Sequence, residues 1–273
     1  MKETSAIAHS GTARTRLWLP AWALCRREVV RFLRQRNRIV GALATPLVFW
    51  LLIGSGVGPG LRLPGMPADM TYLAYFFPGT VVMILLFTAI FSTISVIEDR
   101  REGFLQGVLV APVAPEAIVL GKFLGGMTLA AGQGMLFCAA APMAGLPMDA
   151  GVIARLVPAV LLVSFGLVGL GFVVAWPLDS TQGFHAIMNV FLLPLWMLSG
   201  ALFPAAAGSW MRFAVQVNPV AYGTAAVRRA FYGDSAVMGF VPSYATAMAV
   251  CALFAALMFA LSVWMVRRRQ EVS

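Results

Sequence analysis

Residues 72–97 read YLAYFFPGTVVMILLFTAIFSTISVI, and residues 98–103 follow as EDRREG. The first stretch contains no Asp, Glu, Lys or Arg. A helix needs roughly 20 apolar residues to cross the hydrocarbon core of a bilayer. The stretch is therefore long and apolar enough to span a membrane, and the charged residues behind it would mark the membrane surface.

Five further windows of 20 to 23 residues also lack Asp, Glu, Lys and Arg, so the sequence predicts six transmembrane helices. The composition agrees, because 60% of the residues are hydrophobic and 11% are charged, against about 25% charged in soluble domains. We therefore expect an all-α integral membrane protein. The predicted spans are 39–58, 72–97, 123–145, 156–178, 184–204 and 244–266.

The whole chain reads as one transmembrane domain. We expect a cytoplasmic tail and an interfacial helix over 1–38, a six-span bundle over 39–266 and a short cytoplasmic tail over 267–273. The net charge of +9 does not indicate nucleic-acid binding, because the basic residues flank apolar runs. The three cysteines are far apart and form no disulfide framework or metal-ligand cluster.

The distribution of Lys and Arg predicts the orientation. With six spans, both termini share one side with the loops after spans two and four, and the side with more Lys and Arg faces the cytoplasm. Fifteen lie on the terminal side: Lys2, Arg14, Arg16, Arg26, Arg27, Arg31, Arg34, Arg36, Arg38, Arg100, Arg101, Lys122, Arg267, Arg268 and Arg269. Five lie on the other side: Arg62, Arg155, Arg212, Arg228 and Arg229.

The segment before the first span is amphipathic at helical spacing. We expect a helix in the plane of the inner membrane surface, with its arginines on lipid phosphates; the alternative is a basic stop before the first span. The apolar face would carry Trp22, Cys25, Val29 and Leu33. The basic face would carry Arg27, Arg31, Arg34 and Arg38.

Two connecting segments are longer than simple turns. Residues 98–122, with prolines at 112 and 115, predict a short helix, a break and a new helix from Glu116. Residues 205–243 mix aromatic side chains with arginines and predict short helices at the outer interface. A seventh span there is rejected because it would bury three arginines at about 2.5–3.5 kcal/mol each.

Several kinds of chemistry are missing from the sequence. Gly121-Lys122 is followed by Phe123, so no Walker A motif is present, and we expect no nucleotide, cofactor or metal on this chain and no catalytic residues. The predicted spans lack ionisable Asp, Glu, Lys and Arg, which weakens a secondary transporter or channel, and a membrane-embedded enzyme lacks a nucleophile and base. Gln133 and Asn189 are the candidate polar residues of a transport pathway.

The residues that follow the second span begin with a mixed-charge group. Glu98, Asp99, Arg100, Arg101 and Glu102 stand at the predicted inner edge of the membrane. Such a group could form ion pairs with a partner protein. The alternative is a solvated loop with local pairing.

The chain resembles the permease subunits of ABC-2 type transporters, in particular those of daunorubicin and nodulation-factor exporters. The resemblance rests on Glu98, Arg101, Glu102 and Gly103, on Leu109 to Val113, on Gly121-Lys122, and on NPVAYGTAAVRRAFYG from Asn218 to Gly233. Alanines in APVAPEA replace the hydroxyl residues often found in relatives, which puts a Ser or Thr contact with the partner in doubt.

The resemblance implies a non-enzymatic permease subunit of an exporter in the bacterial inner membrane. Two permease chains would pair, each with a separate ATP-binding subunit that carries ATP and Mg²⁺. The apolar spans suit a hydrophobic or amphipathic substrate. The coupling residues would be Glu98, Asp99, Arg100, Arg101, Glu102, Gly103 and Pro112. The external helices would include Asn218, Pro219, Arg228 and Gly233.

Overall fold

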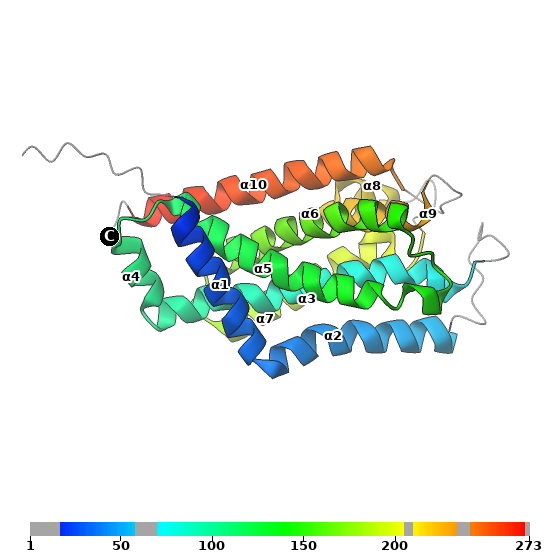
Figure 1. The fold of residues 1–273 in the computed structure, drawn as a ribbon, viewed down its shortest axis with the longest axis horizontal. Coiled ribbons are helices and arrows are strands. Elements are labelled where there is room, and N and C mark those ends of the chain that lie inside the picture. The colour runs from blue at the N-terminus through cyan, green and yellow to red at the C-terminus, as the bar shows by residue number, and fades with distance from the viewer. Residues whose placement is uncertain (1–16, 58–69, 205–209, 234–240, 271–273) are drawn as a thin grey trace, which may run out of the picture.

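A computed structural model describes residues 17–57, 70–204, 210–233 and 241–270, and the regular structure in these ranges is helical (Figure 1). The α-helices are α1 Trp18–Arg34, α2 Arg36–Leu51, α3 Tyr72–Arg101, α4 Phe104–Val110, α5 Pro115–Cys138, α6 Ala150–Ala175, α7 Thr181–Trp196, α8 Trp210–Val217, α9 Pro219–Tyr232 and α10 Tyr244–Gln270. Shorter π or 3₁₀ segments are η1 Leu52–Val57, η3 Ala141–Ala144 and η4 Met197–Ala201.

The long helices run roughly along one axis of the molecule (Figure 1). At one end, α4 projects from the bundle and α1 lies across α5. We call this the α4 end; it also holds the end of α10. At the opposite end, the α9 end, lie α8 and α9. Residues placed at the two ends are therefore separated by the length of the bundle.

Helix α3 forms the centre of the bundle and packs on α2, α5, α6, α7 and α9. It begins at Thr71, whose hydroxyl accepts a hydrogen bond from the amide of Ala74 at 3.2 Å, a typical N-cap. It ends at Arg101, two residues before Gly103, whose φ of +75° is readily adopted by glycine and stops the helix. The charged residues after the second predicted span are therefore the last turn of α3.

Five helices in the described ranges are long and apolar enough to cross a membrane, which makes the chain a multi-pass membrane protein. These are Arg36–Gly56, Tyr72–Arg101, Ala150–Ala175, Thr181–Ala201 and Tyr244–Gln270. They confirm five of the six predicted spans.

The predicted span 123–145 is wrong in its bounds. Helix α5 begins at Pro115 and ends at Cys138, and the following residues turn through η3. Its glycines, Lys122 and Gln133 lower its mean hydropathy, and it is not one of the five apolar helices. Its 24 residues would still extend about 36 Å at about 1.5 Å per residue.

Helix α9 is one of the two short helices that the structure describes within the predicted external segment 205–243, and it is mostly buried in the bundle. It packs on α3, α6 and α10, and most of its residues are buried. Asn218 caps its start by accepting from the amide of Val220 at 2.9 Å, Pro219 occupies its first turn, and Gly233 ends it with a φ of +61°. The motif noted in the sequence therefore encloses one buried helix.

Candidate functional site

Eight charged side chains from α1, α2, α3 and α5 form a network at the α4 end. The four cations and four carboxylates are equal in number, so the network is neutral when all are ionised. We call this group the charge network. Its members are Arg27, Glu28, Arg31, Arg38, Glu98, Asp99, Glu102 and Lys122.

Asp99 is the centre of the charge network and is fully buried. The guanidinium of Arg27 donates to both carboxylate oxygens of Asp99, at 2.7 Å and 3.0 Å. Arg31 and Lys122 also donate to this carboxylate. A carboxylate removed from water is stable only when it is paired and hydrogen-bonded in this way, so Asp99 requires α1 and α5 to stay in place.

Lys122 lies inside α5, the helix that the sequence predicted from Glu116, and its side chain is buried. Its ammonium donates to Glu28 Oε1 at 2.6 Å and to Ser95 Oγ at 3.2 Å, in addition to Asp99. All three donor positions of the ammonium therefore have acceptors, one from α1 and two from α3. Lys122 is the only network member on α5.

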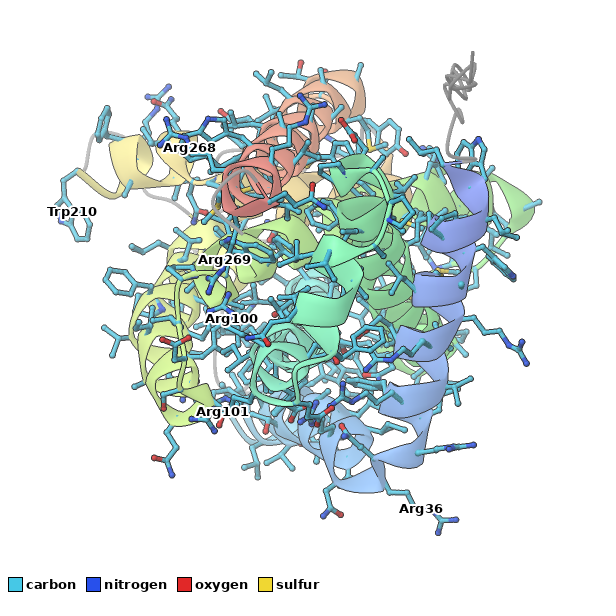
Figure 2. The ribbon with its side chains drawn as sticks, turned by 90° about the vertical axis from the view of Figure 1, so that its left-hand side faces the viewer. Arg36, Arg100, Arg101, Trp210, Arg268 and Arg269 are labelled. Atoms are coloured by element: carbon cyan, nitrogen blue, oxygen red, sulfur yellow. The ribbon has the colours of Figure 1, made fainter. Side chains whose placement is uncertain are left out.

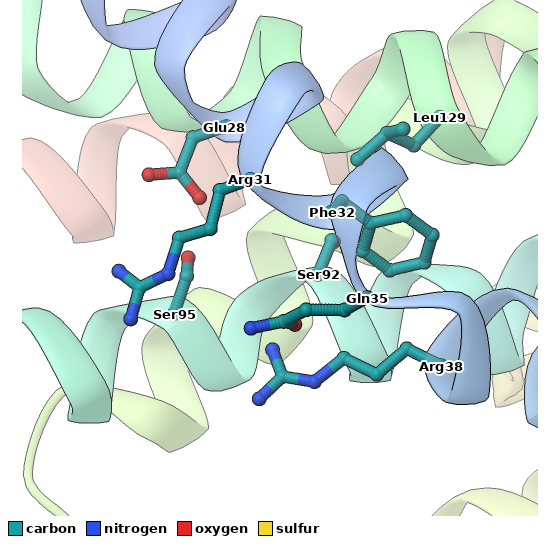
Figure 3. A pocket seen from close by; sticks show the side chains of 8 residues that line it. All are labelled: Glu28, Arg31, Phe32, Gln35, Arg38, Ser92, Ser95 and Leu129. Atoms are coloured by element: carbon teal, nitrogen blue, oxygen red, sulfur yellow. The ribbon is translucent and has the colours of Figure 1, made fainter.

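The outer part of the network is more exposed than Asp99 and Lys122, and two of its members, Arg31 and Arg38, are shown in Figure 3. Arg31 reaches Glu98 at 3.0 Å and Glu102 at 2.9 Å, and Arg38 also donates to Glu98. In the close view, Arg31, Gln35 and Arg38 extend from α1 and α2 toward α3, where Ser95 is seen.

Two cavities of about 10 Å³ each, close to the smallest volume that can hold a water molecule, both border Glu28. Both cavities are lined by Ser92 and Ser95 as well as by Glu28. This polar space next to paired charges leaves room for small rearrangements of the network.

Two glycines bring α1 close enough to complete the network. A Cβ at Gly121 would lie 2.7 Å from the carbonyl oxygen of Ala21 and from Leu24 Cβ. A Cβ at Gly125 would lie 2.7 Å from Glu28 Cβ. Positions four apart share one face of a helix, so α5 presents a flat strip on which α1 rests.

The network touches α4 directly. The guanidinium carbon of Arg27 lies 3.6 Å from the centre of the Phe104 ring, at the first residue of α4. This cation–π contact joins α4 to the same arginine that binds Asp99. A movement of α4 would therefore change the contacts of both α1 and α3.

Arg100 and Arg101 do not belong to the charge network. Both are labelled in Figure 2, which views the molecule from the α4 end. Arg100 pairs with Asp179 at 3.0 Å and donates to the carbonyl oxygens of Leu178 and Trp176. Arg101 donates to the carbonyl oxygen of Asp179 at 2.8 Å. The two arginines tie the end of α3 to the turn between α6 and α7.

An apolar groove of about 450 Å³ separates α1 from α4. It opens beside the charge network, because Phe104 lines the groove and also carries the Arg27 contact. Its lining includes Pro20, Ala23, Leu24, Phe104, Gly107 and Val108. Val110, the last residue of α4, is 76% exposed.

The expectation that the arginines of the amphipathic segment bind lipid phosphates is wrong for three of the four, of which Arg27 and Arg31 lie on α1 and Arg38 on α2. Arg27, Arg31 and Arg38 point to carboxylates of the protein and not to lipid phosphates, because α3 places its acidic last turn against that face. Arg34 is exposed, as expected for a surface arginine. Trp22 is also exposed, at 66%, so the outward face of α1 is mixed in character.

The two candidate pathway residues lie apart. Gln133 is buried and accepts a hydrogen bond from Thr88 at 2.7 Å, between α3 and α5. Asn189 is exposed on α7 beside Val190 and Phe191. Pro112 lies in the break between α4 and α5 that the sequence predicted.

Sequence reasoning did not select Glu28, Lys122 or Ser95 as site residues. Glu28 is an acid among arginines in a helix, and Lys122 comes directly before an apolar run, so both were visible as unusual charges. Ser95 precedes Asp99 by one helical turn. These side chains meet through contacts between residues that are 23 to 94 positions apart in the chain. The local sequence gives no signal for such contacts.

Comparison with known proteins decides the family. Residues 21–232 match the family described as ABC-2 type transporter. This chain belongs to the ABC-2 type transporter family. The matched segment runs from α1 through α9, so it contains the whole charge network.

The relatives of this ABC-2 permease are of low identity. Nodulation protein J of Rhizobium leguminosarum bv. trifolii is 28% identical over 190 residues, which are 68% of this chain and 70% of the relative. The probable multidrug ABC transporter permease YbhR of Escherichia coli K12 is 23% identical, over 62% of this chain and 46% of the relative. The match to YbhR thus spans less than half of that protein. Nodulation protein J of Sinorhizobium fredii is 26% identical, over 92% and 93% of the two chains.

Proposed function

We propose that this ABC-2 permease is the membrane subunit of an ATP-driven exporter and that the charge network transmits movement of α4 to the transmembrane helices. The observation that carries the proposal is Arg27, which contacts Phe104 of α4 and binds Asp99 of α3. ATP and Mg²⁺ are held by a separate ATP-binding subunit.

The partner subunit would dock on α4 and the groove beside it. The groove is apolar and open, and the exposed side chain of Val110 continues its surface. Burial of such a surface by a partner is favourable at about 25 cal/mol per Å². The site adjoins Glu102, the most exposed carboxylate of the network, so docking and charge rearrangement would occur together.

Movement of α4 would be converted into helix movement by exchange of ion pairs. Arg31 is bound to Glu98, Asp99 and Glu102 at once, so it can release one carboxylate while it keeps the others. Because the buried charges stay paired, such an exchange avoids the cost of an isolated buried ion. The small polar cavities next to Glu28 provide room for it.

Two permease chains would form the complete pathway. Asn189 lies exposed on an otherwise apolar face of α7 with Val190 and Phe191. An amide in lipid gains from an interhelical hydrogen bond worth about 1–2 kcal/mol, which a second copy would supply. In this proposal α5 crosses the bilayer as the sixth span, the α4 end lies in the cytoplasm of a bacterial cell, and the substrate is hydrophobic or amphipathic.

The decisive experiment changes Glu98 in the complex with the ATP-binding subunit. Glu98→Ala removes the acceptor of Arg38 and one acceptor of Arg31. We expect the complex to form and basal ATP hydrolysis to continue, while stimulation by substrates from a panel of lipids, drugs and glycans falls about tenfold, within the usual range of coupling free energies.

Arg36→Gln is the matched control, because Arg36 is an exposed arginine on the same helix as Arg38. This variant should retain full stimulation. Gly103→Pro tests coupling through the backbone, since proline fixes φ near −65° and Gly103 has a φ of +75°. Wild-type stimulation in both Glu98→Ala and Gly103→Pro would refute the coupling role.

A further inference from the structure

The α9 end contains a buried arginine without a carboxylate partner. Arg228 of α9 is 3% exposed, and no ion pair joins it to an acid in the part of the chain that the structure describes. Its Nη2 donates to the carbonyl oxygen of Gly200 at 3.0 Å, and its guanidinium lies 4.4 Å from the centre of the Tyr75 ring. Its buried Nε has no acceptor.

This arrangement differs from that of the buried cation at the α4 end. There, Lys122 is neutralised by the carboxylates of Glu28 and Asp99, whereas Arg228 lies against the carbonyl oxygen of Gly200 and the side chain of Tyr75. A buried charge without a counter-ion is costly. An anion bound at this position would neutralise it.

Arg228 is not needed to satisfy the backbone around it. The carbonyl oxygen of Gly200 also accepts from the Tyr75 hydroxyl at 3.0 Å, so loss of the arginine would not leave it unpaired. Gly200 has a φ of +78° within the π turn η4. The turn thus keeps its glycine and its tyrosine contact without the cation.

Two hydroxyl groups lie on the elements that hold the arginine, α9 and η4. Thr224 precedes Arg228 by one turn of α9, and its hydroxyl lies 3.2 Å from that of Ser199, next to Gly200. A guanidinium with neighbouring hydroxyls matches the oxygens of a carboxylate, phosphate or sulfate. The described charged residues near this end are four arginines and one acid: Asp149, Arg155, Arg212, Arg228 and Arg229.

We propose that Arg228 recognises the anionic head group of an amphipathic substrate when η4 and α9 separate at this end. This inference rests on the proposed export function and adds to it a substrate class: an apolar chain that ends in a carboxylate, phosphate or sulfate. The resting arrangement holds the guanidinium against Gly200 and Tyr75 until the anion replaces them.

The test measures binding of 11-(dansylamino)undecanoic acid and of its uncharged methyl ester to the full chain in phosphatidylcholine nanodiscs, with empty nanodiscs subtracted. We expect wild type to bind the acid more tightly than the ester. Arg228→Met should weaken acid binding about tenfold or more, as for a lost hydrogen bond to a charged group, and leave ester binding unchanged. Arg228→Lys should retain part of the affinity for the acid.

Arg212→Gln is the matched control, since it removes an exposed arginine from α8 and should change neither affinity. The melting temperature of Arg228→Met should not fall below that of wild type, because an uncompensated buried charge is removed. A large fall with equal loss of acid and ester binding would indicate a structural clamp and overturn the proposal.

Two other results would also overturn the proposal: equal binding of acid and ester by wild type, or unchanged acid binding by Arg228→Met. Displacement of the probe by excess acetate would assign a small-anion site in place of an amphiphile site. The assay contains no ATP-binding subunit, so a failure here leaves the Glu98 experiment intact, and a failure of coupling there leaves this one intact.

Discussion

At the scale of single residues, the α4 end depends on charges that are satisfied only by one another. Asp99 has three cationic donors, and Lys122 has three acceptors. Breaking a buried ion pair costs more than the pair gains, because the remaining charge stays in a medium of low dielectric constant. Lys122 is the most informative member, since it alone joins α5 to the network.

Lys122→Met should lower the free energy of unfolding by about 3–5 kcal/mol, the usual effect of removing one partner of a buried pair. The measurement is unfolding of the purified chain in mixed micelles. Lys122→Arg keeps the charge and should lower the free energy of unfolding by a smaller amount. Unfolding of Lys122→Met at the same denaturant concentration as wild type would show that the buried pairs do not contribute to stability.

At the scale of helices, α1 is positioned by the glycine strip of α5 and not by its own amphipathic pattern. The Cβ of an alanine at residue 121 would meet the carbonyl oxygen of Ala21 at 2.7 Å, and a backbone atom cannot move without moving α1. Close approach of helices through small residues is general in membranes. Here it also sets the distance between Glu28 and Lys122.

Gly121→Ala should push α1 away from α5 and lower the free energy of unfolding by about 1–3 kcal/mol, as for other overpacked sites. The same variant should lose substrate stimulation of the partner's ATP hydrolysis. Gly132→Ala is the control on the same helix, because its Cβ would meet nothing within 4 Å and alanine favours helix by about 1 kcal/mol. Equal stability of Gly121→Ala and Gly132→Ala would contradict the packing argument.

At the scale of the whole molecule, the two ends have different tasks in the proposed mechanism. The α4 end holds a neutral network beside an apolar groove, and the α9 end holds an uncompensated arginine. Helix α3 connects them, since Tyr75 lies near its start and Asp99 near its end. A shift of α3 along or about its axis would therefore change both ends.

The proposed orientation predicts opposite labelling of two exposed positions. Val110→Cys on α4 should react with a membrane-impermeant maleimide only in inside-out vesicles, and Trp210→Cys on α8 only in intact cells; both native side chains are more than 70% exposed. The native cysteines are buried, and burial, with a smaller effect of Glu28, raises the pKa of the Cys25 thiol. Background labelling near neutral pH should therefore be low. Labelling of Val110→Cys in intact cells would show that the α4 end faces the outside, opposite to the proposed orientation.

The sequence by itself determined the apolar helices and several of their ends. Long runs without charge predicted five of the spans, because burial in lipid requires only local composition. Gly103, Asn218 and Gly233 determined helix ends, because capping acts within a few residues. The span at 123–145 failed where Lys122 and glycines lie inside the helix and a turn follows Cys138.

Only the tertiary structure decided what the charges bind. Arg27 and Asp99 are 72 residues apart in the chain, and Lys122 and Glu28 are 94 apart. An arginine on an amphipathic helix has the same local pattern whether it faces a lipid phosphate or a buried carboxylate. The choice depends on which helix packs against it, and long-range packing made Arg27 part of a network and left Arg228 without an acid.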